Sequence, residues 1–418
     1  MRKVRFGAVL ISIHLLAIVS IGKNTLGAVF HNGGTGNCQG CHTTPPELIG
    51  YDPSSTCLSC HQAPLGLAEP KDNYVASDER GSALCTQLSP GGDFCWLKRS
   101  YNWSSGSHGA RLEEISPGER HGHNIIALEF DFTADTKHLY APGGRYRADN
   151  LSCISCHDPH GTYRRLSDGT IRREGPPIVA SGSYADSPSL DAGSSVGVYR
   201  LLAGKGYSPR YLAGGYFFTA DPPAAIAPVT YNRAETSTDT RVAYGSGMSE
   251  WCSNCHASML NDNCSGARQH GAGNGARLTQ DIIRNYRSYI SSGNLAGNSV
   301  NSYSSLVPYE MGTNDYAILK SIANSNGINL SGPPSGANVM CLTCHRAHAS
   351  GWDSMTRWNM NAEFIVYGGH YPGIDNSSSA QYAQGRTTME IQKTFYDRRA
   401  GAFAPYQRSL CNKCHNKD

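Results

Sequence analysis

The sequence is short of apolar residues for its length. Only 39% of its 418 residues are hydrophobic, while 46 are glycine and 21 are proline. A chain of this length ordinarily forms two or three domains, and so small an apolar share argues against densely packed helices or sheets. The charged fraction of 17% in turn argues against an intrinsically disordered chain. We therefore expect something other than aliphatic side chains to fill the interior.

A basic excess is also missing. The formal net charge is +3, whereas a nucleic-acid-binding surface needs basic residues gathered on one face to contact the phosphates. This charge balance excludes nucleic acid as an expected partner.

Beyond its N-terminus the chain lacks an apolar run of membrane-spanning length. Residues 6–22 are mostly apolar, follow three basic residues and precede the small pair Gly27-Ala28, which is the pattern of an export signal. We expect cleavage after Ala28; an uncleaved membrane anchor is the alternative. Removing residues 1–28 takes away four of the 36 basic residues and no acidic residue, so the mature chain has 32 basic and 33 acidic residues. We expect the mature chain, residues 29–418, to be a single domain that is attached to a membrane at most peripherally.

Cysteine, by contrast, is plentiful and regularly spaced. Twelve of the 15 cysteines fall in six Cys-x-x-Cys-His units, at residues 38–42, 57–61, 153–157, 252–256, 341–345 and 411–415. In such a unit two thiols form thioethers with the porphyrin vinyl groups, and the adjacent histidine becomes the proximal ligand of the iron. The sequence therefore predicts six c-type haems. The predicted attachment cysteines are Cys38, Cys41, Cys57, Cys60, Cys153, Cys156, Cys252, Cys255, Cys341, Cys344, Cys411 and Cys414, and the predicted proximal ligands are His42, His61, His157, His256, His345 and His415.

Structural zinc is the alternative interpretation of these units, because the interval between the first two falls in the range of four-cysteine zinc sites. Zinc does not require a histidine directly after every second cysteine, and the later units are too isolated to share zinc pairwise. We therefore favour haem. Three cysteines remain, and spacing alone cannot pair them: Cys85 and Cys95 could form a disulfide in an oxidising compartment, or they could stay free like Cys264.

The segments between the units predict a multihaem fold that is mostly coil, with short helices and few strands, wrapped round its cofactors. Glycine and proline pairs interrupt these segments. Helices are predicted only at residues 278–291, where Leu278, Ile283 and Tyr286 share a face, and at residues 388–398. The second helix would place Met389, Ile391, Phe395 and Tyr396 on one face, with Thr387 or Thr388 as its N-cap.

The supply of histidine decides what the irons can do. Without the signal and the six proximal residues, nine histidines remain for six distal positions: His31, His108, His121, His123, His138, His160, His270, His348 and His370. This supply favours iron closed by two histidines, which is suited to electron transfer. His160 and His348 each follow a proximal histidine by three residues and cannot reach the far side of the same haem. Each is therefore expected to ligate a neighbouring haem.

Several sequence strings extend this interpretation. They are SPGGDF at Ser89, GERHGHN at Gly118, CHDPHGTYRR at Cys156, RVAYGSGMSEWCSNCH at Arg241, CHRAHASGWDSMTR at Cys344 and FAPYQRSLCNKCH at Phe403. In these strings, and over essentially the whole mature chain, the sequence resembles the OmcS family of hexahaem outer-surface cytochromes of metal-reducing bacteria. The resemblance implies a chain of stacked bis-histidine haems that continues from subunit to subunit in an extracellular filament. It also implies that His31, His123, His160, His270 and His348 are distal ligands.

The sequence departs from this family at one place. In the family, a histidine three residues after the first proximal one ligates a haem of the adjacent subunit, and Pro45 stands at that place here. By the family's arrangement the haem at His345 loses its distal ligand. Either a spare histidine replaces it, with His108, His138 and His370 as candidates, or that iron is five-coordinate.

The expected function is electron transfer by a non-enzymatic protein at the outer surface or outside the cell. Expected partners are other copies of the chain, other multihaem cytochromes and extracellular acceptors such as metal oxides. A monomeric periplasmic electron shuttle is one alternative, and a multihaem reductase with one open haem is another. The absence of a Cys-x-x-Cys-Lys unit disfavours the reductase.

Overall fold

The computed structural model describes residues 31, 38–65, 74–78, 80, 84–105, 112–209, 215–228, 242–260, 271–298, 307–323, 332–376 and 379–415. The predicted signal at residues 1–28 lies outside these ranges, as do Cys264, His108 and His270. In the described part of the chain, no helix combines the length and the apolar character needed to span a membrane.

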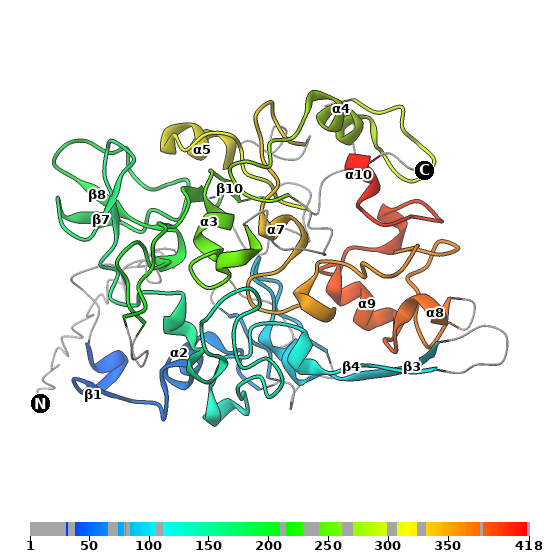
Figure 1. Ribbon diagram of the computed structural model, residues 1–418, viewed down its shortest axis with the longest axis horizontal. Helices are drawn as coiled ribbons and strands as arrows, with labels where there is room; N and C mark the ends of the chain where they lie inside the picture. Colours follow the sequence, from blue (N-terminus) through cyan, green and yellow to red (C-terminus); the bar gives the residue numbers. More distant parts are fainter. Residues whose placement is uncertain are drawn as a thin grey trace, which may run out of the picture.

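The structure is mostly coil, as predicted, with short elements spread over its whole extent (Figure 1). The α-helices are α2 (Pro53–His61), α3 (Met248–Cys252), α4 (Gln280–Ser288), α5 (Tyr316–Ala323), α7 (Cys341–Cys344), α8 (Ala380–Ala383), α9 (Thr388–Thr394) and α10 (Asn412–His415). The strands are β1 (His42–Thr44), β2 (Glu47–Leu48), β3 (Tyr101–Ser105), β4 (Leu112–Ser116), β5 (Arg164–Arg165), β6 (Ile171–Arg172), β7 (Ile178–Ala180), β8 (Ser195–Gly197), β9 (Ala225–Ile226) and β10 (Ala243–Tyr244). The 3-10 helices are η1 (Cys38–Gly40), η2 (Phe94–Lys98), η3 (Gly118–Arg120), η4 (Leu128–Phe130), η5 (Ala148–Asn150), η6 (Cys153–Ser155), η7 (Tyr199–Leu201), η8 (Ala257–Met259), η9 (Asp353–Met355) and η10 (Ala400–Ala402).

The two predicted helices are present but shorter than expected. Helix α4 begins after Thr279, whose hydroxyl accepts a hydrogen bond from the Ile282 N–H at 3.3 Å, and it ends at Ser288 because Tyr289 has extended backbone angles. Helix α9 begins after Thr387, which forms a capping box with Glu390. The prediction that Met389 lies on its buried face is wrong, because its side chain is 60% exposed.

The strands form small separate sheets. Strands β3 and β4 pair as an antiparallel hairpin, and the largest sheet has the order β6-β5-β8-β7. None of these strands exceeds five residues. Sheets of this size cannot build a continuous core.

Buried apolar side chains form five separate clusters rather than one. Cysteines of the haem units pack at the edges of three of them: Cys344, Cys411 and Cys414 at the largest, Cys252 at the second and Cys153 at the third. The predicted attachment residues therefore border the clusters, where a large apolar cofactor would join one cluster to the next.

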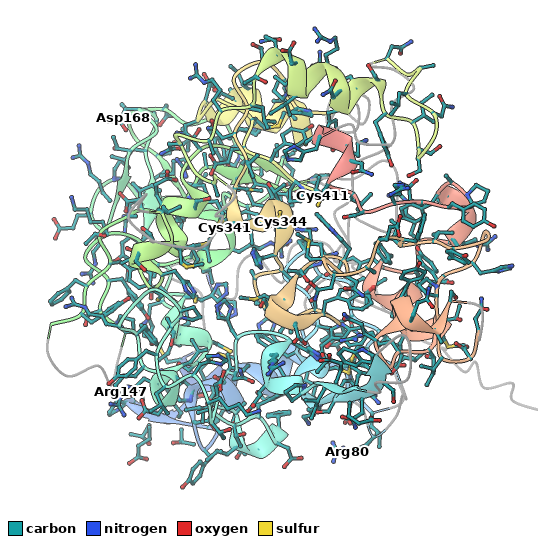
Figure 2. All side chains as sticks on the ribbon, turned by 45° about the vertical axis from the view of Figure 1, so that its right-hand side comes forward. Arg80, Arg147, Asp168, Cys341, Cys344 and Cys411 are labelled. Carbon is teal, nitrogen blue, oxygen red and sulfur yellow. A yellow bond between two sulfur atoms is a disulfide. The ribbon has the colours of Figure 1, made fainter. Side chains whose placement is uncertain are left out.

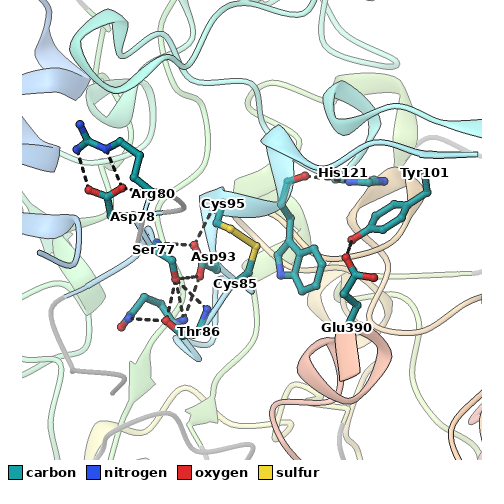
Figure 3. Close-up of a disulfide and its surroundings, with 12 residues drawn as sticks. Ser77, Asp78, Arg80, Cys85, Thr86, Asp93, Cys95, Tyr101, His121 and Glu390 are labelled. Atoms are coloured by element: carbon teal, nitrogen blue, oxygen red, sulfur yellow. Dashed lines mark hydrogen bonds and ion pairs between the residues drawn. A yellow bond between two sulfur atoms is a disulfide. The ribbon is translucent and has the colours of Figure 1, made fainter. Parts of the chain in front are cut away.

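A disulfide links two of the three cysteines left outside the haem units. Cys85 and Cys95 are joined with a Cα–Cα distance of 5.5 Å, and both are buried (Figure 3). Asp93 lies against them and accepts hydrogen bonds from the N–H groups of Ser77, Gln87 and Cys95. Both thiols are used in the disulfide, so Cys85, Asp93 and Cys95 do not form a metal site even though they lie close together.

Replacing both Cys85 and Cys95 by alanine should lower the free energy of unfolding by about 3 kcal/mol. A cross-link over a sequence separation of 10 residues removes roughly this much chain entropy from the unfolded state. Denaturant unfolding of the holoprotein measures the effect, and the haem content should stay that of the wild type. Loss of haem in the double variant would instead show that the disulfide guides haem attachment.

Candidate haem sites

Each Cys-x-x-Cys-His unit forms one turn of helix or tight coil. In four units the histidine N–H donates to the carbonyl of the first cysteine at 3.0 to 3.1 Å, namely in His157, His256, His345 and His415. The unit of His61 lies at the end of helix α2. A helical turn places residues i, i+3 and i+4 on one face, so the two thiols and the imidazole of a unit point the same way.

The units follow one another through the molecule in sequence order. Cys57 lies beside Cys153, and Cys252 beside Cys341, because in each pair one thiol raises the pKa of the other. The remaining neighbours lie close enough to interact electrostatically: Cys41 with Cys60, Cys156 with Cys255, and Cys344 with Cys411 and Cys414. Figure 2 shows Cys341 and Cys344 beside Cys411, and in Figure 1 the path leads from β1 near the N-terminus through α2, α3 and α7 to α10. The six predicted attachment sites therefore form one continuous row.

Four of the predicted proximal histidines face a second histidine ring. The ring centroids are 6.1 Å apart for His31 and His61, 6.5 Å for His42 and His160, 6.0 Å for His123 and His256, and 6.4 Å for His157 and His348. Two metal–nitrogen bonds of about 2 Å each, added to the half-widths of two imidazole rings, require a separation of roughly 6 Å. These pairs therefore have the spacing of two imidazoles on opposite sides of one metal ion.

The two histidines that were expected to serve a neighbouring haem face rings from other units. His160, of the third unit, faces His42 of the first, and His348, of the fifth unit, faces His157 of the third. Their roles as ligands stay predictions, but the geometry of the rings fits them.

Backbone carbonyls orient these imidazoles. The Nδ1 atoms of His157, His256 and His345 each lie 2.8 Å from a carbonyl oxygen, of Arg200, Pro142 and Ser354 respectively. His123 Nδ1 lies 2.7 Å from the Ala347 carbonyl. A carbonyl accepts only from a protonated Nδ1, so the hydrogen bond leaves the Nε2 lone pair for a metal.

The surrounding protein keeps the rings of His123 and His348 neutral. Removal from water lowers the pKa of His123 to about 4 and that of His348 to about 3, and neighbouring histidines add to the effect. A neutral imidazole is the form that ligates a metal. The thiols, the free Nε2 atoms and the ring separations together fit covalently attached haem.

The remaining histidines are arranged differently. His345 faces no other histidine ring within the described ranges. His270, one of the expected distal ligands, lies outside these ranges. His138 hydrogen-bonds to Asp135 at the surface, and His370 is exposed.

Sequence reasoning missed the role of His121, which it counted only as a spare. His121 is fully buried, with its ring nitrogens 2.7 Å from the Ser116 hydroxyl and 3.0 Å from the Trp96 carbonyl. It therefore serves the packing of this region. His121 lies two residues before His123, and nothing in the surrounding sequence distinguishes a histidine that packs in the interior from one that ligates a metal.

No protein-family model matches the chain. A curated relative does: the C-type cytochrome OmcS of Geobacter sulfurreducens is 46% identical over 415 residues, which covers 93% of this chain and 94% of the relative. The chain belongs to the OmcS family of c-type cytochromes. As a member of this family it carries covalently bound haem and transfers electrons rather than catalysing a reaction.

Two solved structures are similar to this chain. One is the cryo-electron microscopy structure of the OmcS nanowires, and the other is that of the Outer Membrane Cytochrome S filament. Both are from Geobacter sulfurreducens. Each matches with a TM-score of 0.85 and 45% identity over 93% of this chain and all of the solved one. The coil-rich fold of the OmcS family is thus the fold of this chain.

Gly91→Ala should disturb the ring of His348. A methyl group on Gly91 would lie 2.7 Å from His348 Nδ1, and that ring cannot withdraw because it is held between Phe94, 4.7 Å away, and His157. We expect a fraction of one iron to become high-spin, as seen by electron paramagnetic resonance. His348→Ala removes the imidazole altogether and should make that iron fully high-spin, so it serves as the reference.

Gly401→Ala is the matched control, because nothing lies within 4 Å of a methyl group at Gly401. Its spectrum should equal that of the wild type. An unchanged low-spin spectrum for both Gly91→Ala and His348→Ala would contradict the assignment of His348 as a ligand.

Proposed function

We propose that residues 29–418 hold six c-type haems, one at each Cys-x-x-Cys-His unit, and that the protein conducts electrons along them. The bound haems supply one-electron chemistry at iron. The chain's own residues attach them, close the irons with paired imidazoles and hold successive units side by side. The observation that carries the proposal is the set of four histidine pairs at 6.0 to 6.5 Å.

The histidine pairs support conduction rather than catalysis. An iron with a histidine on both sides has no open position for a substrate, whereas it changes oxidation state with little rearrangement. The closeness of successive units supports transfer over short steps from one end of the row to the other. The proposed distal ligands are His31, His123, His160, His270 and His348.

The similarity to solved nanowire and filament structures supports assembly of this chain into an extracellular filament. In such a filament the unit of His42, near the N-terminal end of the row, and the unit of His415, at the other end, would come close to units of neighbouring copies. Proposed acceptors of the electrons are other multihaem cytochromes and external solids such as metal oxides. We propose that residues 1–28 direct the export of the chain and are then removed by cleavage after Ala28.

The mature protein should carry six covalent haems. Intact mass and a pyridine haemochrome assay on the same sample measure the number of haems per chain. A mass equal to residues 29–418 plus six haems is the expected result, and it also tests cleavage after Ala28. Four or fewer haems would defeat the proposal.

The iron at His345 should be closed by a histidine of another copy. No ring in the described part of this chain faces His345, Pro45 offers no donor atom, and His138 and His370 are exposed and able to reach a neighbour. We expect the reduced filament to bind negligible carbon monoxide, and dissociated chains to bind about one equivalent per chain. A spectrophotometric titration of both forms measures this.

The outcomes of this titration separate the alternatives. In filaments, His138→Ala or His370→Ala should open the site, and the variant that binds carbon monoxide identifies the ligand. Negligible binding by dissociated chains would assign the site to a histidine of the same chain, with His108 as the candidate. One equivalent bound by intact filaments would favour the open iron of a reductase.

A further inference from the structure

Two of the six units are held by the same backbone arrangement, although the segments that make it share no sequence. The third unit, with His157, is contacted by residues 199–203, and the fifth unit, with His345, by residues 353–357. We call these two segments the straps. These two units are also the ones in which a second histidine follows three residues after the proximal one.

The contacts of the two straps correspond residue by residue. At the third unit, Nδ1 of His157 lies 2.8 Å from the carbonyl oxygen of Arg200, the second residue of the strap. The N–H of Asp158, the residue after the histidine, donates to the Leu201 carbonyl at 2.8 Å. The strap returns a bond from the Ala203 N–H to the carbonyl of Cys156 at 2.9 Å.

At the fifth unit the same three bonds recur. Nδ1 of His345 lies 2.8 Å from the Ser354 carbonyl, Arg346 donates its N–H to Met355, and the Arg357 N–H donates to the carbonyl of Cys344, the last two both at 2.8 Å. Each proximal histidine also forms an isolated antiparallel bridge with the third residue of this set, Leu202 or Thr356.

Each strap contains two consecutive residues in the left-handed region. The φ angles are 52° and 57° for Arg200 and Leu201, and 55° and 48° for Ser354 and Met355. Residues other than glycine disfavour this conformation, and it persists only where the surroundings impose it. In a helical turn of either hand successive carbonyls point in a similar direction, whereas in a strand they alternate. The left-handed pair is therefore what lets two adjacent carbonyls accept bonds from the histidine ring and the next N–H.

Further contacts fix each strap in place. The Arg200 N–H donates to the Ser183 hydroxyl at 2.9 Å, and the Trp251 indole N–H donates to the carbonyl of Ala203 at 2.7 Å. In the other strap, Arg120 donates to the Asp353 carboxylate at 3.3 Å and the Ser350 hydroxyl donates to the Thr356 carbonyl at 2.7 Å. The strained residues are thus held by bonds on both sides.

A left-handed pair elsewhere in the described part of the chain has a different role. Tyr396 and Asp397 have φ angles of 54° and 60°, but their N–H groups bond to Lys393 and Gln392 at the end of helix α9. This pair ends a helix, whereas the pairs in the straps hold a histidine.

We propose that the two straps are positioning elements that orient His157 and His345 toward their irons and lower the reduction potentials of those haems. The proposal rests on the haem sites proposed above. A hydrogen bond from Nδ1 to a carbonyl makes the imidazole a stronger donor and so favours the oxidised iron. The second bond, to the residue after the histidine, directs the following turn so that His160 and His348 face His42 and His157.

Substitution at Ser354 tests the proposal, because its side chain is exposed and only its backbone conformation is needed. Valine disfavours the left-handed region, whereas glycine and asparagine tolerate it. In Ser354→Val we expect the equilibrium between oxidised and reduced iron to shift about tenfold toward reduced iron at one haem, a rise of about 59 mV. Ser354→Gly and Ser354→Asn should keep all six potentials. A potentiometric titration followed by absorbance and electron paramagnetic resonance measures them.

Asp131→Val is the matched control. Asp131 is exposed, has a φ angle of 56° and forms no hydrogen bond to a predicted ligand, so this variant carries the same backbone strain away from the straps. It should keep all six potentials while losing a similar amount of stability. If the Ser354→Val protein is not produced in measurable amount, Ser354→Ala is measured instead. Its reduction potential at that haem should rise by a smaller amount.

Two results would overturn the proposal. One is a set of six unchanged potentials in Ser354→Val or Ser354→Ala. The other is an equal shift in Ser354→Gly, which would assign the effect to the lost side chain. Fewer than six haems in the wild type would count against the proposed function instead, so the two failures are distinguishable.

Discussion

The hydrogen bond between a histidine Nδ1 and a backbone carbonyl is the interaction on which the rest of this structure depends. It leaves Nε2 as the metal-binding nitrogen and fixes the plane of the ring. Four of the predicted ligands make such a bond at 2.7 to 2.8 Å: His123, His157, His256 and His345. Three of the carbonyls come from loops distant in the sequence, and that of Ser354 comes from a turn nine residues after His345. The path of the chain therefore has to be irregular wherever it passes a haem unit.

This constraint accounts for the shortage of regular structure. A carbonyl inside a helix or a sheet is already used by its own ladder, whereas a carbonyl in a loop or a turn is free to accept from an imidazole. The carbonyls of Arg200 and Ser354 are available because they lie in left-handed turns, and that of Pro142 because it precedes a glycine turn at Gly143. The chain thus uses its glycines and turns to bring carbonyls to the histidines.

The same constraint accounts for a core that is divided. Five apolar clusters, the largest of them formed largely by residues 276–414, are separate in the described part of the chain, and three of them end at cysteines of the haem units. Haem attached at these cysteines, as proposed above, would complete the core between the clusters with its apolar faces. The shortage of apolar residues in the composition follows from this division of the core.

The sequence by itself determined the number and position of the haem units, because each unit is local and its residues are consecutive. It also determined the coil-rich fold and the helices near residues 278–291 and 388–398, whose hydrophobic periodicity is a local property as well. It did not predict helices α2 and α5, although both are longer than α9. The hydrophobic periodicity did not predict where the two predicted helices end or that Met389 is exposed, because both depend on how the helices pack against the rest of the fold.

Only the tertiary structure decided which rings face one another, that Cys85 pairs with Cys95, and that His121 is packed in the interior rather than facing another histidine. It alone also revealed the straps. The physical reason is that a backbone carbonyl belongs to every residue. Arg200 and Ser354 perform the same task with unrelated side chains, so no sequence pattern marks them, and only the folded chain brings them to His157 and His345.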